Sequence, residues 1–206
     1  MNNHGVLLNR SIEWGIACQS ADRDVESGDA YVVKSIAGGM LLAVVDGLGH
    51  GKPAAEAATL AAATVNECAE GSIASIFARC HEQLKGTRGV VMSCAIFNAA
   101  ESVMTWAGVG NVEGRLIRLG TDSMVRETSL LLKGGVIGDR LPRVRTVIKT
   151  VSHGDVVILA TDGIRAGFDE RLNLRSTPQQ IADAILASHR RHGDDALVLV
   201  ARYVGS

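Results

Sequence analysis

The strand-like segments of this chain follow one another in groups, and this order limits the folds that the chain can adopt. Apolar stretches typical of strands open the sequence at residues 11–18, 30–36 and 40–45. Gly38-Gly39 separates the last two by the length and residue type of a hairpin turn. Strict β-α-β alternation, which is typical of doubly wound parallel sheets, is missing. We therefore expect antiparallel sheets with helices packed outside them.

Helix-like segments occur in two places. Residues 52–70 are rich in alanine, with Pro53 in the first turn, where proline is tolerated. Ser72 is a candidate cap for a second helix to about residue 85, and Ser176 or Thr177 for a third to about residue 190. The other strand-like stretches are residues 89–98, 102–109, 112–119, 144–151, 156–160 and 196–204. No repeat or linker divides the chain, so we expect an α+β fold in one domain over residues 1–206.

The charge balance excludes one class of partner and says little about the others. The chain has 21 basic and 22 acidic side chains, a formal net charge of −1 and 3% aromatic residues. It therefore lacks both the positive field and the stacking surfaces of a nucleic-acid-binding protein. The longest apolar run, residues 36–45, is far shorter than the roughly 20 residues of a membrane span, and we expect no membrane partner.

The cysteines and the first residues indicate the compartment. Cys18, Cys68, Cys80 and Cys94 show no C-x-x-C pair or zinc-finger spacing, so we expect free thiols in a reducing environment. Residues 1–10 lack the pattern of a signal peptide. We expect a cytoplasmic protein.

Acidic residues stand at the ends of several predicted strands. Asp29, Asp46, Asp162 and Asp194 each lie beside a glycine or another aspartate. A carboxylate in such a place loses water and needs a partner. One Asp-Gly pair is usually a turn, but four such sites in one small sheet protein favour a site of hard oxygen ligands, which suits Mg²⁺ or Mn²⁺.

A phosphate-binding glycine loop is the competing interpretation of residues 47–51, Gly-Leu-Gly-His-Gly. Here Asp46 precedes the first glycine and would repel a phosphate unless a cation lay between them. The third glycine is one position early for G-x-G-x-x-G, and the Walker lysine is missing. The sequence therefore favours a metal site over a dinucleotide-binding fold.

Five motifs in order resemble those of the metal-dependent PPM protein serine/threonine phosphatases, and most of all the compact SpoIIE-like branch with its stressosome phosphatases. They are Gly28-Asp29, Val45-Asp46-Gly47-Leu48-Gly49, Gly108-Val109-Gly110-Asn111, Thr161-Asp162-Gly163 and Asp194-Asp195. The resemblance covers about residues 11–204. It implies an α-β-β-α sandwich of two mainly antiparallel sheets flanked by helices, with a two-metal centre between the sheets.

The resemblance also implies roles for particular residues. Asp46 would bridge two divalent ions, Mn²⁺ or Mg²⁺, and the Gly47 carbonyl would bind the second ion. Asp162 and Asp194 would complete the first site and share the catalytic role with Asp46. Asp29 would act on the second ion.

Other positions would support the centre or depart from the family pattern. Asp195, beside a ligand, and Asn111, where some relatives place an aspartate for a third ion, would support the ligands without binding metal. Many relatives have a histidine as candidate general acid where this chain has Leu48, and His50 either substitutes for it or faces solvent. The phosphate-binding arginine would be Arg23, one residue off the family register, with Arg88 as the other possibility.

The activity implied is hydrolysis of phosphoserine and phosphothreonine by metal-activated hydroxide. Two cations neutralise the phosphate dianion and lower the pKa of a bound water, so no covalent intermediate is needed. The resemblance implies phosphorylated STAS-domain stressosome proteins as partners and feedback regulation of a stress response. The alternatives are a phosphatase of an anti-anti-sigma factor and an inactive phosphoprotein-binding module.

Overall fold

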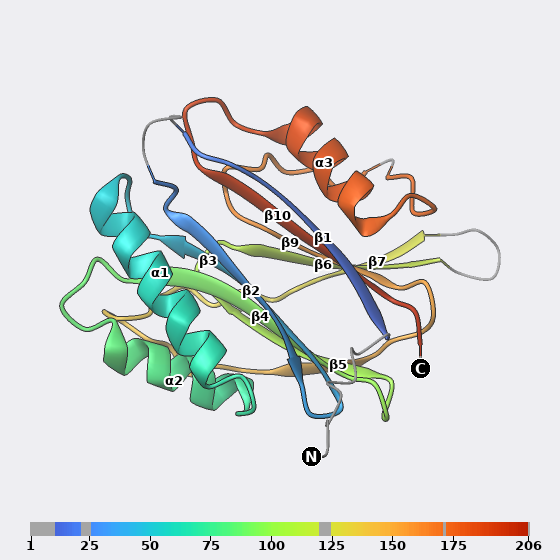
Figure 1. The fold of residues 1–206 in the computed structure, drawn as a ribbon, viewed down its shortest axis with the longest axis horizontal. Helices are drawn as coiled ribbons and strands as arrows, with labels where there is room; N and C mark the ends of the chain where they lie inside the picture. The colour runs from blue at the N-terminus through green and yellow to red at the C-terminus, as the bar shows by residue number, and fades with distance from the viewer. Residues whose placement is uncertain (1–10, 22–25, 120–124, 171, 206) are drawn as a thin grey trace, which may run out of the picture.

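The described part of the chain forms two five-stranded sheets that face each other (Figure 1). The structure is a computed structural model and describes residues 11–21, 26–119, 125–170 and 172–205. All pairs of neighbouring strands are antiparallel. One sheet contains, in spatial order, β1 (Ile12–Gln19), β10 (Ala196–Tyr203), β9 (Val156–Ala160), β6 (Glu113–Leu119) and β7 (Val125–Ser129). The other contains β2 (Asp29–Ile36), β3 (Gly39–Gly47), β4 (Val90–Asn98), β5 (Val103–Val109) and β8 (Val147–Thr150).

Helices cover the outer face of each sheet, which confirms the predicted α-β-β-α sandwich. The helices α1 (Lys52–Glu67) and α2 (Ile73–Gln83) lie on the β2–β8 sheet, whereas α3 (Pro178–His189) lies on the β1–β7 sheet. Apolar side chains fill three layers: one under α1 and α2, one between the sheets and one under α3. The interior strand β3 faces two of these layers, with Leu41 and Val45 toward the helices and Leu42 and Val44 toward the other sheet.

The helix starts follow from capping chemistry. The Ser72 hydroxyl accepts a hydrogen bond from the Ser75 N–H, as predicted. At α3 the cap is Thr177 rather than Ser176, because Thr177 and Gln180 form a reciprocal capping box. The first helix ends at Glu67, three residues before the predicted end, where the Gly71 N–H closes a turn onto the Cys68 carbonyl.

The observed strands differ from the predicted ones in three places. Gly38, with φ of 74°, is in the hairpin turn, but Gly39 belongs to β3. A β-carbon at Gly39 would lie 1.7 Å from the Phe97 carbonyl oxygen, so this glycine serves the close approach of β4. The strand β8 is shorter than the predicted 144–151, and β7, with the sequence VRETS, has no apolar run from which it could be predicted.

The described residues contain no helix that is long and apolar enough to cross a membrane. All four cysteines are free thiols, and Cys80 and Cys94 are buried.

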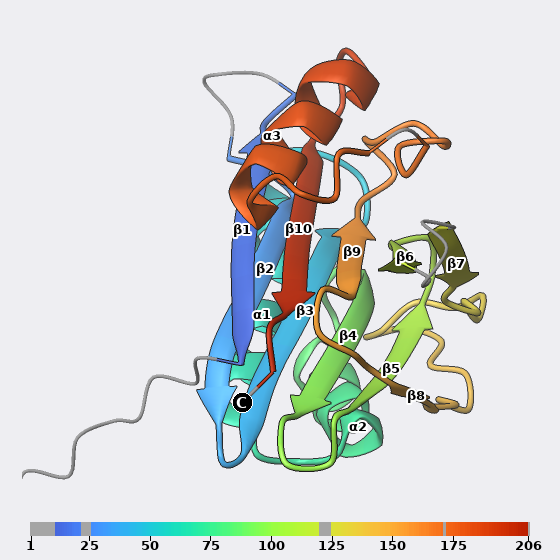
Figure 2. The same cartoon turned by 90° about the vertical axis from the view of Figure 1, so that its right-hand side faces the viewer.

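The strand directions bring the predicted acidic residues to one end of the sandwich. β3 and β9 end there, and β2 and β10 begin there, at the upper end in Figure 2. Because residues at strand ends inherit the inward or outward alternation of the strand, an acid there can point into the space between the sheets.

The contact between α3 and β1 is unusually close. The Gln179 side chain donates to the Ile16 carbonyl (2.7 Å) and accepts from the Ile16 N–H (3.1 Å). A β-carbon at Gly15 would lie 2.3 Å from the Gln179 backbone nitrogen. Only glycine therefore permits this packing distance.

We expect Gly15→Ala to destabilise the protein by about 1–3 kcal/mol, because α3 must move away from β1. Thermal unfolding measures this as a lowered Tm. The matched control is Gly134→Ala, since nothing lies within 4 Å of a β-carbon at Gly134. Equal Tm values for the two variants would contradict this account of the packing.

Candidate metal centre

Two acids of the β2–β8 sheet are direct neighbours across the strands. Asp46 is near the end of β3 and Asp29 begins β2, and the two residues are partners in the register of the sheet. Val44 lies two residues before Asp46 and Val33 lies four residues after Asp29, so each valine is on the same face of its strand as that acid. Both valines pack in the layer between the sheets. Asp46 and Asp29 therefore continue this inward face at the rim of the sandwich.

The opposite sheet supplies the other acids from two adjoining loops. Asp162 follows β9, and Asp194 and Asp195 precede β10. A β-carbon at Gly163 would lie 1.8 Å from the Asp195 carbonyl oxygen. Glycine at position 163 thus lets the two loops touch, and this contact holds Asp162 near Asp194.

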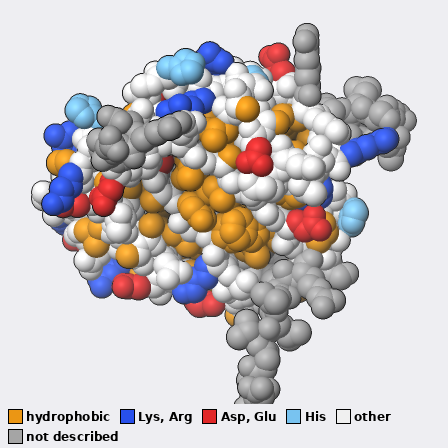
Figure 3. All heavy atoms as spheres, turned by 45° about the horizontal axis from the view of Figure 1, so that its top comes forward, with side chains coloured by type: hydrophobic (Ala, Val, Ile, Leu, Met, Phe, Trp, Pro, Cys, Tyr) orange, Lys and Arg blue, Asp and Glu red, His pale blue; other side chains and the backbone are white. Residues whose placement is uncertain are grey.

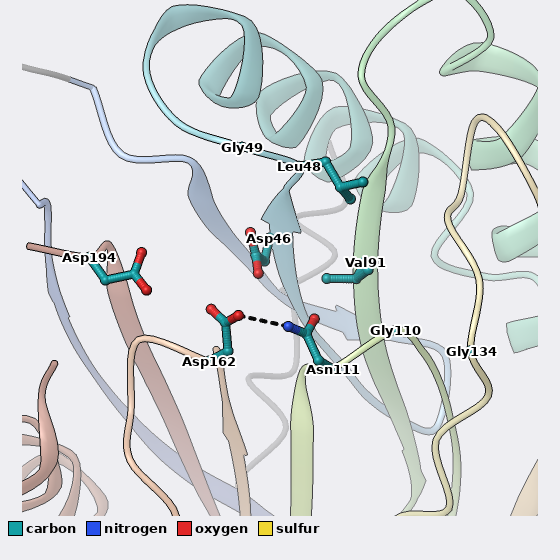
Figure 4. Close-up of a pocket in the computed structure, with 9 residues that line it drawn as sticks. All are labelled: Asp46, Leu48, Gly49, Val91, Gly110, Asn111, Gly134, Asp162 and Asp194. Atoms are coloured by element: carbon teal, nitrogen blue, oxygen red, sulfur yellow. Dashed lines mark hydrogen bonds between the residues drawn. The ribbon is translucent and has the colours of Figure 1, made fainter.

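Carboxylates from both sheets line one pocket of about 420 Å³. Figure 4 shows Asp46, Asp162 and Asp194 around the same hollow. Asp46 is half-buried, whereas Asp162 and Asp194 are exposed. The other lining residues are Leu48, Gly49, Val91, Gly110, Asn111 and Gly134.

Asn111 orients one of these carboxylates. Its side-chain amide donates a hydrogen bond to Oδ2 of Asp162 over 2.7 Å (Figure 4). The turn before it needs Gly110, which has φ of 96° and whose β-carbon would collide with Val91 at 2.1 Å. Asn111 therefore reaches the pocket as a donor to a carboxylate.

Asp195 does not line the pocket, and its carboxylate holds neighbouring backbone in place. Its carboxylate accepts hydrogen bonds from the Ala21 N–H (2.7 Å) and the Gly28 N–H (2.6 Å). The Gly28 carbonyl in turn accepts from the Gly47 N–H. Asp195 thus fixes the segment that leads into β2 and its first residue, Asp29.

Asp29 is close to the other acids but does not line the same pocket. It lines a neighbouring hollow of about 290 Å³, together with Tyr31 and Leu197. Its Oδ2 accepts a hydrogen bond from the Thr161 hydroxyl (2.8 Å), which itself accepts from the Leu197 N–H. No role was predicted for Thr161, although its position as a polar residue directly after the apolar strand β9 was an available signal.

Two other predicted positions are not among the described residues of the pocket. Arg23 lies outside the described residues. His50 is exposed and is not among the residues that line the pocket, whereas Leu48 is.

Burial and like charges disfavour ionisation of the acids. Burial, followed by the charge of Asp46, raises the pKa of Asp29 to about 8. Burial, followed by the charges of Asp162 and Asp194, raises the pKa of Asp46 to about 7. The pKa of Asp194 is also raised, first by burial and then by Asp162. The Arg191 guanidinium lowers the pKa of Asp194, but burial and the neighbouring carboxylates outweigh it.

The chemistry of the donors fits divalent cations that prefer oxygen. Carboxylates and backbone carbonyls suit Mg²⁺ and Mn²⁺, and neither thiols nor histidines line the pocket. The side chains do not form a closed ligand shell as they stand. Within residues 11–21, 26–119, 125–170 and 172–205, no three His, Cys, Asp or Glu side chains are arranged to hold an ion.

Comparison with known proteins identifies the family. Residues 37–204 match the family described as Stage II sporulation protein E (SpoIIE). The phosphoserine phosphatase RsbX of Bacillus subtilis (strain 168) is 28% identical over 137 residues, which are 66% of this chain and 67% of RsbX.

Solved structures agree with the family match. One similar structure comes from work on the bacterial stressosome as a modular system adapted to control secondary messenger signalling. It is 30% identical to this chain with a TM-score of 0.82, and the match covers 93% of this chain and 99% of the other chain. RsbX in complex with magnesium has a TM-score of 0.83 at 22% identity, and the coverage is 95% and 96%. The predicted resemblance to SpoIIE-like phosphatases is confirmed, and RsbX is among the proteins that this chain resembles.

The raised pKa values predict how the stability of the metal-free protein depends on pH. The native state keeps the proton on Asp29 up to about pH 8 and the proton on Asp46 up to about pH 7. The unfolded chain releases both protons at about pH 4. The free energy of unfolding should therefore fall as the pH rises through this window. Each pKa unit corresponds to about 1.4 kcal/mol.

Denaturant unfolding with a chelator present, between pH 5 and 8.5, measures this slope. We expect Asp46→Asn to flatten the slope and to be more stable than the wild type at pH 8. Glu101→Gln, at an exposed turn residue, is the control. Parallel profiles for the wild type and Asp46→Asn would contradict the assignment of the pH dependence to this cluster.

Proposed function

The chain belongs to the SpoIIE family of PPM protein serine phosphatases, and from this premise we propose that it removes phosphate from phosphoserine and phosphothreonine of STAS-domain stressosome proteins. The serine phosphatase activity follows from the family. The observation that carries the assignment to this site is the pocket in which Asp46 from one sheet meets Asp162 and Asp194 from the other.

We assign the ligand roles as follows. Asp46 would bridge two ions, Mn²⁺ or Mg²⁺, with the Gly47 carbonyl on the second ion. Asp162 and Asp194 would complete the first site, and Asp29 would act on the second. When bound, such ions neutralise the phosphate and lower the pKa of a water for attack on phosphorus. Burial and, after it, the like charges of Asp162 and Asp194 raise the pKa of Asp46, and this supports the assignment because a bound cation would offset both effects.

The remaining residues of the site would keep the ligands in place. Asn111 holds one oxygen of Asp162 and leaves the other toward the pocket. Thr161 and Asp195 tie the two sheets together through Asp29 and the Gly28 backbone. Outer partners of this kind set ligand orientation in metal sites.

The choice of substrate rests on similarity. The stressosome structure at 30% identity and the name of RsbX as a phosphoserine phosphatase support a stressosome protein as substrate. We propose that the protein acts in the cytoplasm, in feedback on a stress response. The free thiols of all four cysteines are compatible with a reducing compartment.

Asp46→Asn tests the proposed function most directly. We expect Mn²⁺-dependent hydrolysis of p-nitrophenyl phosphate and of phosphorylated STAS proteins to fall more than about 100-fold, beyond the 10- to 100-fold effect of outer-shell changes. Glu101→Gln should retain activity. Equal rates for the wild type and Asp46→Asn would refute the metal mechanism. Hydrolysis of a phosphorylated anti-anti-sigma factor alone would change the substrate and keep the chemistry.

Asn111→Ala tests the support of Asp162. We expect a loss of about 10- to 100-fold in metal affinity or in turnover, with the Tm nearly unchanged because Asn111 is exposed. Calorimetric titration with Mg²⁺ measures the affinity. Asn66→Ala, at an exposed position of α1, is the control and should bind like the wild type. Unchanged affinity and turnover in Asn111→Ala would exclude the orienting role.

A further inference from the structure

We propose that Arg88 binds the substrate phosphate at the mouth of the metal pocket. The inference rests on the proposed phosphatase function and adds a phosphate-binding residue to it. It concerns a different part of the chain from Arg23, since Arg88 lies in the connection between α2 and β4.

The backbone fixes the position of Arg88 next to the loop that follows Asp46. The Leu48 N–H donates to the Gly89 carbonyl over 3.1 Å. Gly89 has φ of 76°, and its N–H donates to the Thr87 hydroxyl. This turn therefore places Arg88 alongside the loop after β3 by hydrogen bonds on both sides of it.

The guanidinium of Arg88 lies on the backbone of Gly49. A β-carbon at Gly49 would lie 2.4 Å from Nη1 of Arg88, so any other residue at position 49 would push this group away. Gly49 lines the pocket together with Asp46, whereas Arg88 itself stands just outside the lining. The positive group therefore lies beside the rim of the pocket, where an incoming phosphate would meet it.

Arg88 has no competing acidic partner in the described part of the chain. It is exposed and forms none of the ion pairs seen there. Other arginines are committed: Arg115 and Arg118 pair with carboxylates, and Arg190 donates to the Ser20 carbonyl. The guanidinium of Arg88 is therefore available to bind a phosphate.

The chemistry of the pocket gives such an arginine a function. A pocket lined by carboxylates repels a phosphate dianion, and metal ions remove that repulsion without fixing the orientation of the phosphate. A guanidinium donates two parallel hydrogen bonds to phosphate oxygens, which an ammonium cannot do. Arg88 would thus orient the phosphate over the carboxylate cluster.

The test compares Arg88→Ala, Arg88→Lys and the control Arg79→Ala, at an exposed arginine of α2. Two quantities are measured with Mg²⁺ present: the affinity for inorganic phosphate by calorimetry, and kcat and KM for p-nitrophenyl phosphate. We expect Arg88→Ala to lose about 10- to 100-fold in phosphate affinity and in kcat/KM, as for a hydrogen bond to a charged group. Arg88→Lys should recover part of the loss, and Arg79→Ala should match the wild type.

The outcomes separate this inference from the proposed function. If the wild type hydrolyses no phosphoester, the proposed function fails, and phosphate affinity still decides the role of Arg88. If the phosphate affinity and kcat/KM of Arg88→Ala equal those of Arg79→Ala, the inference is overturned. The inference is also overturned if Arg88→Ala and Arg88→Lys lose Mg²⁺ affinity, or show a lowered Tm, to the same extent. The role of Arg88 would then be structural.

Discussion

Repulsion among carboxylates that are partly withdrawn from water is the constraint on which the rest of this structure depends. Asp29 and Asp46 come from one sheet, and Asp162 and Asp194 from the other, so the two sheets cannot close at this end without bringing negative charges together. The raised pKa of Asp46 expresses that cost. A divalent cation offsets it, and the hydrogen bonds from Thr161 and Asn111 stabilise two of the carboxylates in the meantime.

The sequence predicted the parts of the fold that have local causes. Ser72, and Ser176 or Thr177, mark helix starts through capping, and the grouped apolar stretches indicate antiparallel sheets. It also predicted that Asp46, Asp162 and Asp194 meet. It could not place Asp29 in a separate hollow, because that depends on a hydrogen bond to Thr161 across the sandwich, 132 positions away in the sequence. The contact of Arg88 with Gly49 is equally nonlocal.

Glycines set the spacing of the site more than its polar residues do. Gly163 lets the loop of Asp162 touch the loop of Asp195, and Gly110 lets the turn before Asn111 lie against Val91 of β4. Each glycine removes a β-carbon at a point where two backbones meet, so the distances between carboxylates are determined by backbone contacts. The Asp-Gly and Gly-Asn motifs of this chain therefore carry geometric information beyond the identity of a ligand.

The bonding of Gln179 to Ile16 has a consequence for how this protein behaves at high concentration. β1 is an outer strand, and its unpaired peptide groups could otherwise join a strand of another molecule. The Gln179 amide imitates a neighbouring peptide and occupies both hydrogen-bonding groups of Ile16 in the middle of β1. A foreign strand would have to displace that side chain before it could pair along the edge. The helix that completes the hydrophobic layer thus also protects the sheet from self-association.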